Sequence, residues 1–430
     1  MQLSVVFYKE YATIRDTEPC LTADRLKGSA DMNLKKGASP LNRTDQSGWE
    51  NTFDPSKNLS PRQRDAARDL IYLVSCAVNK TKPDAAACLA MDLSEVYRLA
   101  KAHSLTAAAS FALEQVTELP HSFDQAKKKA IRKLALFDIE RAVILQNFDT
   151  SGIWYLPLKG ILLRNDYPKA AMREMSDNDI LVDPERMKQV RDIMETLGYT
   201  CEDYGHFNHD VYSKPPTLEF EIHHALFDKD DTLPFSAYYE NIADRLVFDG
   251  YQGKMTDEDF YLYMLCHTYR HYIYAGCGLR SLLDIYVFLC AHEGLDRDYL
   301  RAELEKVHLT SFEEEMQTLS KKVFSGALLS EREQRELDRF IFSGSYGNHQ
   351  SAEYNKLARK LGYNDSRQAK RDYLRKRVFL SGDRLRKRYP IVSKHKALYP
   401  FVMIYRPIRG MLRHPKKIIR EYRNVIRFKQ

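Results

Sequence analysis

The feature that most constrains the fold is a series of strand-like segments in the middle of an otherwise helical chain. An apolar and aromatic run covers residues 153–158 and ends at the turn Lys159-Gly160. Further strand-like runs follow at 179–182, near 199–203 and at 218–223. Because strands and helices mix only in this central stretch, the sequence predicts an α+β fold, with a small sheet between helical N- and C-terminal regions.

Changes in composition and apolar periodicity along the chain also suggest how it divides into regions. Residues 1–58 are polar and unpatterned, and we expect them to be mostly disordered or loosely attached. Ser60-Pro61 then has the form of a helix start, a cap followed by proline at the first helical position. The expected units after the N-terminal segment are a helical region (59–150), the strand-bearing core (151–245), a second helical region (246–345) and a basic amphipathic tail (346–430).

The charge is distributed unevenly. Residues 351–430 carry 24 Lys and Arg against 5 Asp and Glu, a net charge of +19, whereas the first 350 residues carry 42 against 54, a net charge of −12. A basic tail on a mildly acidic body predicts that the tail meets something anionic.

The tail also contains an apolar stripe opposite its Lys and Arg residues, formed at helical spacing by Ile418, Ile419, Tyr422, Val425 and Ile426. A basic amphipathic helix of this kind suits the surface of an anionic membrane. A helix packed on the body, with its cationic face in solvent, is the open alternative. Nucleic acid is not expected, because no stacking aromatics are interleaved with a recognised module.

The cysteines and the N-terminus indicate a compartment. Seven cysteines are spread along the chain without CxxC or Cys/His metal-ligand spacing, which favours a reducing cytosol. The N-terminal apolar run is short and soon meets charged residues, so it has the features of neither a signal peptide nor a membrane span. We therefore expect a cytoplasmic protein, peripheral at the inner face of the membrane if the tail binds lipid.

Two carboxylates at the head of the second strand are the first chemical signal. Asp177 and Asp179 are two residues apart, and side chains alternate across a strand, so both point to the same side and can share a cation. Hard oxygen ligands suit Mg²⁺ or Mn²⁺. A polar turn that leads into a strand is the plain alternative.

The strand 218–223 strengthens the metal interpretation. Leu218, Phe220 and Ile222 form one apolar face, and Glu219, Glu221 and His223 form the other. An ordinary surface strand can show this alternation, but a third carboxylate beside the aspartate pair is what two-metal phosphoryl transfer needs.

Taken in order, four motifs resemble those of a bacterial family of uncharacterised nucleotidyltransferases in the polymerase-beta superfamily: Leu158-Lys159-Gly160, Arg173, Ser176 to Val182, and Glu221-Ile222-His223. The resemblance implies a mixed sheet of the polymerase-beta type, Mg²⁺ or Mn²⁺, and transfer of a nucleoside monophosphate from an NTP. It also implies the roles of particular residues. The catalytic metal ligands would be Asp177, Asp179 and Glu221, and the nucleotide would be bound by Lys159, Gly160 and Arg173.

The acceptor is less defined. Residues 265–284 resemble the family's next helical segment, and the candidates for an acceptor pocket are Glu219, His223, His267 and Arg280. His267 and His271 share one helix face, but no third Zn²⁺ ligand accompanies them.

We expect the acceptor to be a sugar or a precursor of a cell-surface polymer. Nucleotide transfer to protein or RNA is an alternative. A non-catalytic binding or assembly module for membrane polysaccharide machinery is another, because Asn178 replaces an aliphatic residue of the family and Lys159-Gly160 replaces the Gly-Ser turn of the superfamily.

Overall fold

A computed structural model describes residues 54–55, 58–205, 207–229, 233–361 and 366–378, together with a few residues between 402 and 426. Most of residues 1–58, which we expect to be disordered or loosely attached, lie outside the described residues. Most of the basic tail, including Ile418, also lies outside them.

The N-terminal helical region contains five helices: α1 (Pro61–Val78), α2 (Ala85–Ala90), α3 (Leu93–Ala102), α4 (Thr106–Leu113) and the long α5 (His121–Thr150). The predicted start of α1 is correct. The side chain of Ser60 accepts from the backbone N–H of Gln63, and the side chain of Gln63 accepts from the N–H of Ser60. This capping box satisfies two backbone donors that the first turn would otherwise leave unpaired.

A sheet of seven strands follows, in the order β3-β4-β5-β2-β1-β7-β6. Its strands are β1 (Tyr155–Pro157), β2 (Asn178–Val182), β3 (Thr200–Asp203), β4 (His209–Lys214), β5 (Leu218–His223), β6 (Val247–Asp249) and β7 (Gln252–Lys254). β2 is parallel to β5 and antiparallel to β1, so the sheet is mixed and the α+β prediction is confirmed. Strands β4, β6 and β7 were not predicted.

The short elements between the strands are α6 (Gly160–Leu163), η2 (Ala170–Met172), η3 (Pro184–Arg186), α7 (Met187–Thr196), α8 (Phe235–Tyr238) and η4 (Ile242–Arg245). After Asp183 the chain forms the turn η3 and then α7. Gly198 then ends this segment in a left-handed conformation (φ +85°), which glycine adopts without strain.

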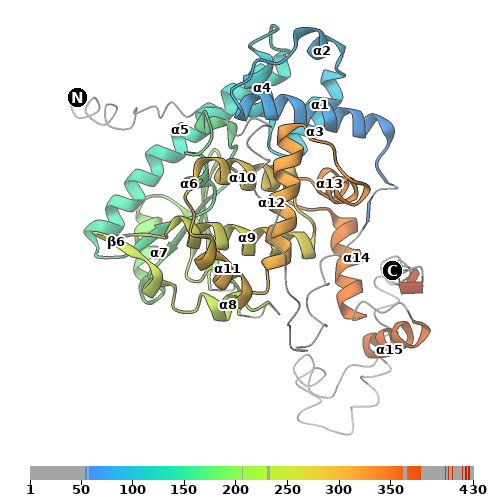
Figure 1. Cartoon of the computed structure of the whole chain (residues 1–430). Coiled ribbons are helices and arrows are strands. Elements are labelled where there is room, and N and C mark those ends of the chain that lie inside the picture. Colours follow the sequence, from blue (N-terminus) through green and yellow to red (C-terminus); the bar gives the residue numbers. More distant parts are fainter. Residues whose placement is uncertain are drawn as a thin grey trace, which may run out of the picture.

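The two faces of the sheet have different environments. One face packs against α5 and α7, in a core that contains Phe137, Ile144, Val190, Phe220 and Ile222. The opposite face, here called the site face, carries Asp179 and Glu221 and lies toward the C-terminal helices (Figure 1). The predicted alternation of strand 218–223 is therefore confirmed.

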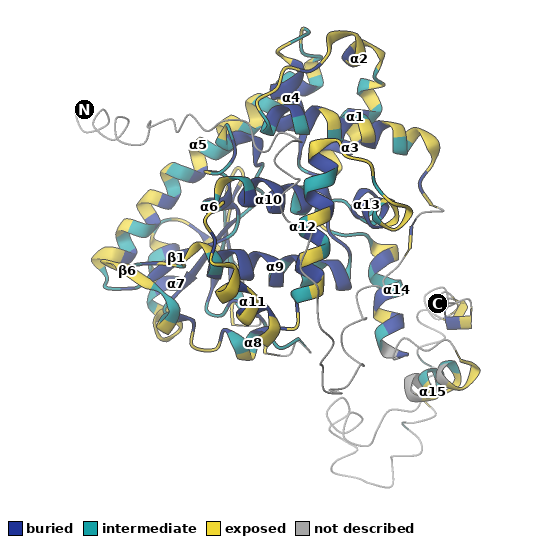
Figure 2. Cartoon of the chain, in the orientation of Figure 1, coloured by how far each residue is buried: buried dark blue, intermediate teal, exposed yellow. Residues whose placement is uncertain are grey.

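The C-terminal helical region contains α9 (Asp257–Tyr274), α10 (Leu279–Ala291), α11 (Arg297–Lys306), α12 (Thr310–Ser325), α13 (Glu331–Ser343), α14 (His349–Lys360) and α15 (Arg367–Val378). Helices α9 and α10 are buried along most of their length (Figure 2). They share one hydrophobic core with α1, α4 and α12, so this core joins the two helical regions. Within the described part of the chain, no helix combines the length and apolar character needed to cross a membrane.

The few described residues of the tail divide into two groups. Val425 is buried with Leu357, Ala358 and Leu361 in a small separate cluster. Three other members of the predicted stripe are about half exposed: Ile419, Tyr422 and Ile426.

Candidate active site

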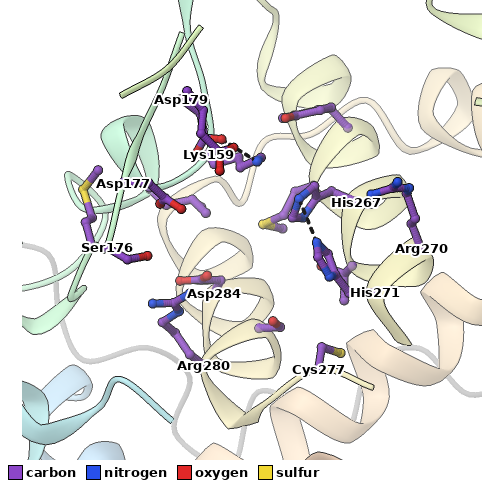
Figure 3. Close-up of a pocket in the computed structure, with 18 of the residues that line it drawn as sticks. Lys159, Ser176, Asp177, Asp179, His267, Arg270, His271, Cys277, Arg280 and Asp284 are labelled. Carbon is purple, nitrogen blue, oxygen red and sulfur yellow. Dashed lines mark hydrogen bonds and ion pairs between the residues drawn. The ribbon is translucent and has the colours of Figure 1, made fainter. Parts of the chain in front are cut away.

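A cavity of about 310 Å³ lies between the site face of the sheet and helices α9 and α10 (Figure 3). Its sheet side is lined by Lys159, Asp177, Asp179, His209, Glu221 and His223, and its helical side by Tyr263, His267, Arg270, His271, Arg280 and Asp284. The cavity therefore brings together carboxylates, imidazoles and cationic side chains from segments that are far apart in the sequence.

Four carboxylates, those of Asp177, Asp179, Glu219 and Glu221, gather at one edge of this cavity. Asp179 and Glu221 are register partners in the parallel pair β2–β5, so their side chains emerge on the same face. Asp177 directly precedes β2, and its carboxylate oxygen lies within 4.8 Å of those of Glu219 and Glu221. Glu219, a candidate for the acceptor pocket from the sequence, thus lies beside the other carboxylates.

The pKa of Asp177 reflects this crowding. Burial, together with the negative charges of Asp179 and Glu221, raises it to about 6. A divalent cation would relieve both the desolvation and the repulsion, so the chemistry of this donor set fits a metal ion.

Asp179 has different partners from its neighbour. Its Oδ1 accepts a hydrogen bond from Nζ of Lys159 at 2.6 Å and lies 3.0 Å from Nε2 of His223. Burial opposes ionisation of Asp179, but Lys159 and His223 hold its pKa well below the usual range. The expected pairing of Asp177 with Asp179 around one metal thus competes with an existing ion pair at Asp179.

The turn Lys159-Gly160 has an unusual backbone. Lys159 precedes α6 with φ +47° and ψ −119°, a region that residues with a side chain rarely occupy. Gly160 is required by its surroundings, because an added Cβ would lie 2.8 Å from Nη1 of Arg173. Strained backbone of this kind is often found at functional sites.

Arg173 is buried beneath this turn and is fixed by α10. Its Nε and Nη2 donate to the two carboxylate oxygens of Asp284 at 2.9 and 3.0 Å. The hydroxyl of Tyr167 donates to the same carboxylate at 2.6 Å. Arg173 lines the cavity, but much of its hydrogen-bonding capacity is already used within the protein.

Arg280, one helical turn before Asp284, also lines the cavity. Its Nη1 donates to the backbone oxygen of Glu174 at 2.9 Å. This contact links α10 to the segment that precedes Asp177, so the position of Arg280 relative to the carboxylates is fixed.

His267 and His271 come from α9 and contact each other, with their Nε2 atoms 3.2 Å apart. Burial and the nearby positive charge of Lys159 lower both pKa values, that of His267 well below its usual value and that of His271 to about 4. The pair is therefore neutral at pH 7 and offers hydrogen bonds rather than charge. Among the described residues, no group of three potential metal ligands includes either histidine.

His209 is a site residue that the sequence analysis missed. It lies on the unpredicted strand β4, opposite His223 in the antiparallel register, and the two ring centroids are 4.9 Å apart. Strand topology could have revealed His209. A return strand between residues 199–203 and 218–223 would have placed His209 beside His223.

The chain belongs to the uncharacterised nucleotidyltransferase family, whose sequence profile matches residues 90–325. This range contains the whole sheet and every residue named above as lining the cavity. No curated protein and no solved structure matches the chain. Membership supports nucleotidyl transfer as the class of activity and implies an NTP as substrate.

Proposed function

We propose that the protein is a metal-dependent nucleotidyltransferase that moves a nucleoside monophosphate from an NTP to a hydroxyl-bearing small molecule. The observation that carries the proposal is the convergence of Asp177, Glu219 and Glu221 within 4.8 Å, beside a cavity lined by Lys159 and Arg280. Carboxylates for a cation and cationic groups for phosphates are the two requirements of this chemistry.

Mg²⁺ or Mn²⁺ would be held by Asp177, Glu219 and Glu221, with Asp179 available if its ion pair with Lys159 opens. A divalent ion bound there would neutralise the negative charge that a triphosphate brings to the site. Without a cation, the three carboxylates would repel the substrate.

The triphosphate would lie toward Lys159, Arg173 and Arg280. An acceptor oxygen forms a bond to the α-phosphorus, the bond between the α-phosphorus and the bridging oxygen breaks, and pyrophosphate leaves. The proton of the acceptor hydroxyl passes to a carboxylate at the cavity edge.

The acceptor would bind on the helical side of the cavity. His267 and His271 are neutral there, and Phe227 and Tyr263 supply an aromatic wall. Neutral hydrogen-bonding groups beside aromatic rings suit a polyhydroxylated molecule such as a sugar, as in a precursor of a cell-surface polymer.

The test combines binding with turnover. We expect Mg²⁺ and an NTP together to raise the melting temperature of the full-length protein, and pyrophosphate to appear when an extract containing small-molecule acceptors is added. Asp177→Asn and Glu221→Gln should abolish pyrophosphate release, whereas Glu195→Gln, a change on the exposed face of α7, should not. Binding of NTP without any release of pyrophosphate would instead support a non-catalytic binding module.

We also propose that the tail brings this activity to an anionic membrane surface. The support is the net charge of +19 in residues 351–430 and the exposure of Ile419, Tyr422 and Ile426. Attraction of Lys and Arg to anionic lipid and insertion of apolar side chains act together at such surfaces.

A further inference from the structure

A second group of potential metal ligands lies next to the carboxylates. His209, Glu221 and His223 each offer one ligand atom, and these atoms lie within 4.8 Å of one another. We propose that this group is a metal centre in its own right, taking a divalent ion that accepts nitrogen ligands, such as Zn²⁺ or Co²⁺, in preference to Mg²⁺.

The strand register builds this centre. His209 of β4 and His223 of β5 are direct antiparallel partners, and Glu221 precedes His223 by two residues, so all three side chains emerge on the site face. The Oε2 atom of Glu221 lies 3.8 Å from Nε2 of His209 and 3.5 Å from Nε2 of His223. An ion between these atoms needs only small side-chain movements to reach ligand distances of about 2.0–2.2 Å.

Asn208 orients both imidazoles. Its side-chain oxygen lies 3.3 Å from Nδ1 of His209, and its side-chain nitrogen lies 3.4 Å from Nδ1 of His223. Each ring therefore turns Nε2 toward Glu221. At His209 the amide oxygen accepts from Nδ1–H, the arrangement that commonly leaves Nε2 of a metal-binding histidine free for the ion. At His223 the amide nitrogen donates to Nδ1, so this ring carries its hydrogen on Nε2, and ion binding needs that hydrogen to move to Nδ1 and the amide to turn away.

The surrounding charges favour a cation at this point. Asp177, Asp179, Glu219 and Glu221 bring four carboxylates to the same edge of the cavity, and Lys159 is the cation that pairs with Asp179. In the structure Nε2 of His223 faces Asp179 at 3.0 Å, and a metal ion would take the place of the hydrogen in that contact.

The two ligand groups differ in chemistry and share one residue. Asp177, Glu219 and Glu221 offer only oxygen, which suits Mg²⁺, whereas His209 and His223 add nitrogen, which favours a softer ion. Because Glu221 belongs to both groups, two ions would lie on either side of one carboxylate. Any catalytic role of the second ion rests on the proposed transferase function, but its binding can be measured without turnover.

The experiment uses full-length protein stripped of metal and then supplied with excess Mg²⁺ to occupy the oxygen-only group. Co²⁺ is titrated in and followed by its visible absorption, which changes with the ligands and the geometry of the ion. We expect saturation at one Co²⁺ per chain, displacement by Zn²⁺, and a weakening of at least about tenfold in His209→Gln.

Two variants serve as controls. Ser213→Ala changes the same face of the same strand without removing a ligand, and Glu219→Gln alters only the neighbouring group, so both should bind Co²⁺ like the wild type. Circular dichroism verifies that each variant is folded. The proposal is overturned if Co²⁺ does not bind in the presence of Mg²⁺, if folded His209→Gln binds as tightly as the wild type, or if Glu219→Gln weakens binding equally.

Failure of the transferase proposal has a different signature. In that case Co²⁺ binds as expected, but neither Mg²⁺ alone nor Mg²⁺ with Zn²⁺ supports the release of pyrophosphate.

Discussion

Lys159 and Asp179 form an ion pair at the edge of the cavity, with Nζ of the lysine 2.6 Å from Oδ1 of the aspartate. The pair joins the strained turn after β1 to the second aspartate of the Asp-Asn-Asp segment. A carboxylate expected to bind metal is thus already neutralised by a lysine from the turn expected to bind phosphate. In the proposed reaction, the metal ion would give Asp179 a new partner and the triphosphate would give Lys159 one.

The first prediction concerns this pair. Lys159→Met should leave the carboxylate of Asp179 buried with His223 as its remaining partner, and it should destabilise the protein by about 3 kcal/mol, the lower end for a broken buried pair. Urea denaturation measures the change. Lys159→Gly also removes the ammonium group but relaxes the backbone at φ +47°, so it should be about 1 kcal/mol less damaging. Equal stability of the wild type and Lys159→Met would show that the pair contributes nothing.

The second prediction concerns the packing of Gly160 on Arg173. A methyl group at Gly160 would lie 2.8 Å from Nη1 of Arg173, which cannot move freely because Asp284 holds it by two hydrogen bonds. Gly160→Ala should therefore cost about 1–3 kcal/mol and weaken NTP binding. Thermal unfolding and nucleotide titration measure the two effects.

Gly294→Ala is the matched control, because its added Cβ would meet nothing within 4 Å. Combining Gly160→Ala with Arg173→Lys tests the cause of the effect. Lysine lacks the guanidinium that meets the methyl group, so the double variant should lose less stability than the sum of the two single losses. Strict additivity would show that the strain has another origin.

Features that depend on neighbouring residues in the sequence could be predicted, whereas contacts between distant segments could not. The sequence predicted that Glu219, Glu221 and His223 lie on one face of their strand. Side chains alternate along a strand, and the apolar residues between these three mark the opposite face. The start of α1 at Ser60-Pro61 was predictable for the same reason.

Contacts between elements were not predictable. The hydrogen bonds of Asp179 depend on how the turn after β1 meets β2, and those of Arg173 join residues 111 positions apart. His209 was missed because β4 (His209–Lys214) lacks a clear apolar alternation, so its pairing with β5 had no local signal. Even a correct strand assignment leaves the register open, and a shift of one residue would turn His209 away from the site.

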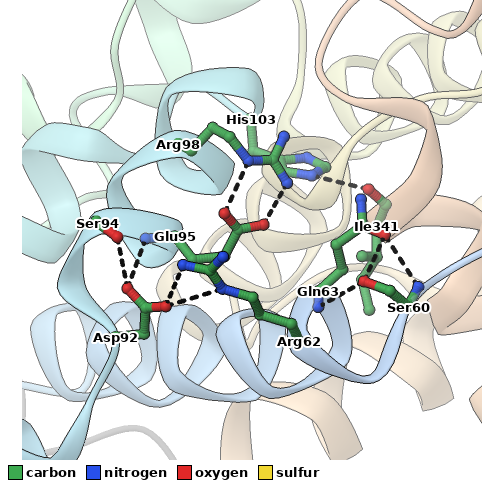
Figure 4. Close-up of polar contacts among 9 residues, drawn as sticks. All are labelled: Ser60, Arg62, Gln63, Asp92, Ser94, Glu95, Arg98, His103 and Ile341. Atoms are coloured by element: carbon green, nitrogen blue, oxygen red, sulfur yellow. Dashed lines mark hydrogen bonds and ion pairs between the residues drawn. The ribbon is translucent and has the colours of Figure 1, made fainter.

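The third prediction concerns pH and the helical body. His103 is fully buried and contacts both Leu279 and Ile341. Figure 4 shows the contact with Ile341. Its Nδ1 accepts from the N–H of Leu279 at 3.1 Å, and its Nε2 therefore carries the hydrogen and donates to the oxygen of Ile341 at 3.1 Å. Burial lowers the pKa of His103 to about 4, so the folded protein keeps this ring neutral at pH values where the unfolded chain would protonate it.

The unfolded state then binds the extra proton between pH 6.5 and about 4, so stability is complete above this window and falls as the pH decreases through it. The loss from this one group should reach about 3 kcal/mol at the acid end. His103→Gln, which does not titrate, should lose about 1 kcal/mol at pH 7 through one hydrogen bond but show a shallower fall toward pH 4. Urea denaturation at several pH values compares the two slopes. Parallel curves would exclude His103 as the source.

The last prediction concerns the tail. If Ile419, Tyr422 and Ile426 insert into the headgroup region, each contributes about 1 kcal/mol, so replacing all three with serine should weaken binding to anionic vesicles roughly a hundredfold. Deletion of residues 395–430 should abolish sedimentation with the vesicles without changing NTP binding by the central domain. High salt should weaken the sedimentation of the wild type, because it screens the attraction between basic side chains and lipid.

Val425 supplies the control, since it is buried against Leu357, Ala358 and Leu361 rather than exposed. Val425→Ala should lower the melting temperature slightly through lost packing and leave vesicle binding unchanged. A full-length protein that ignores anionic vesicles at low salt would contradict the membrane role. The burial of Val425 would then indicate the role of the whole segment. It would be a cationic helix that packs on the body and keeps its charged side chains in solvent.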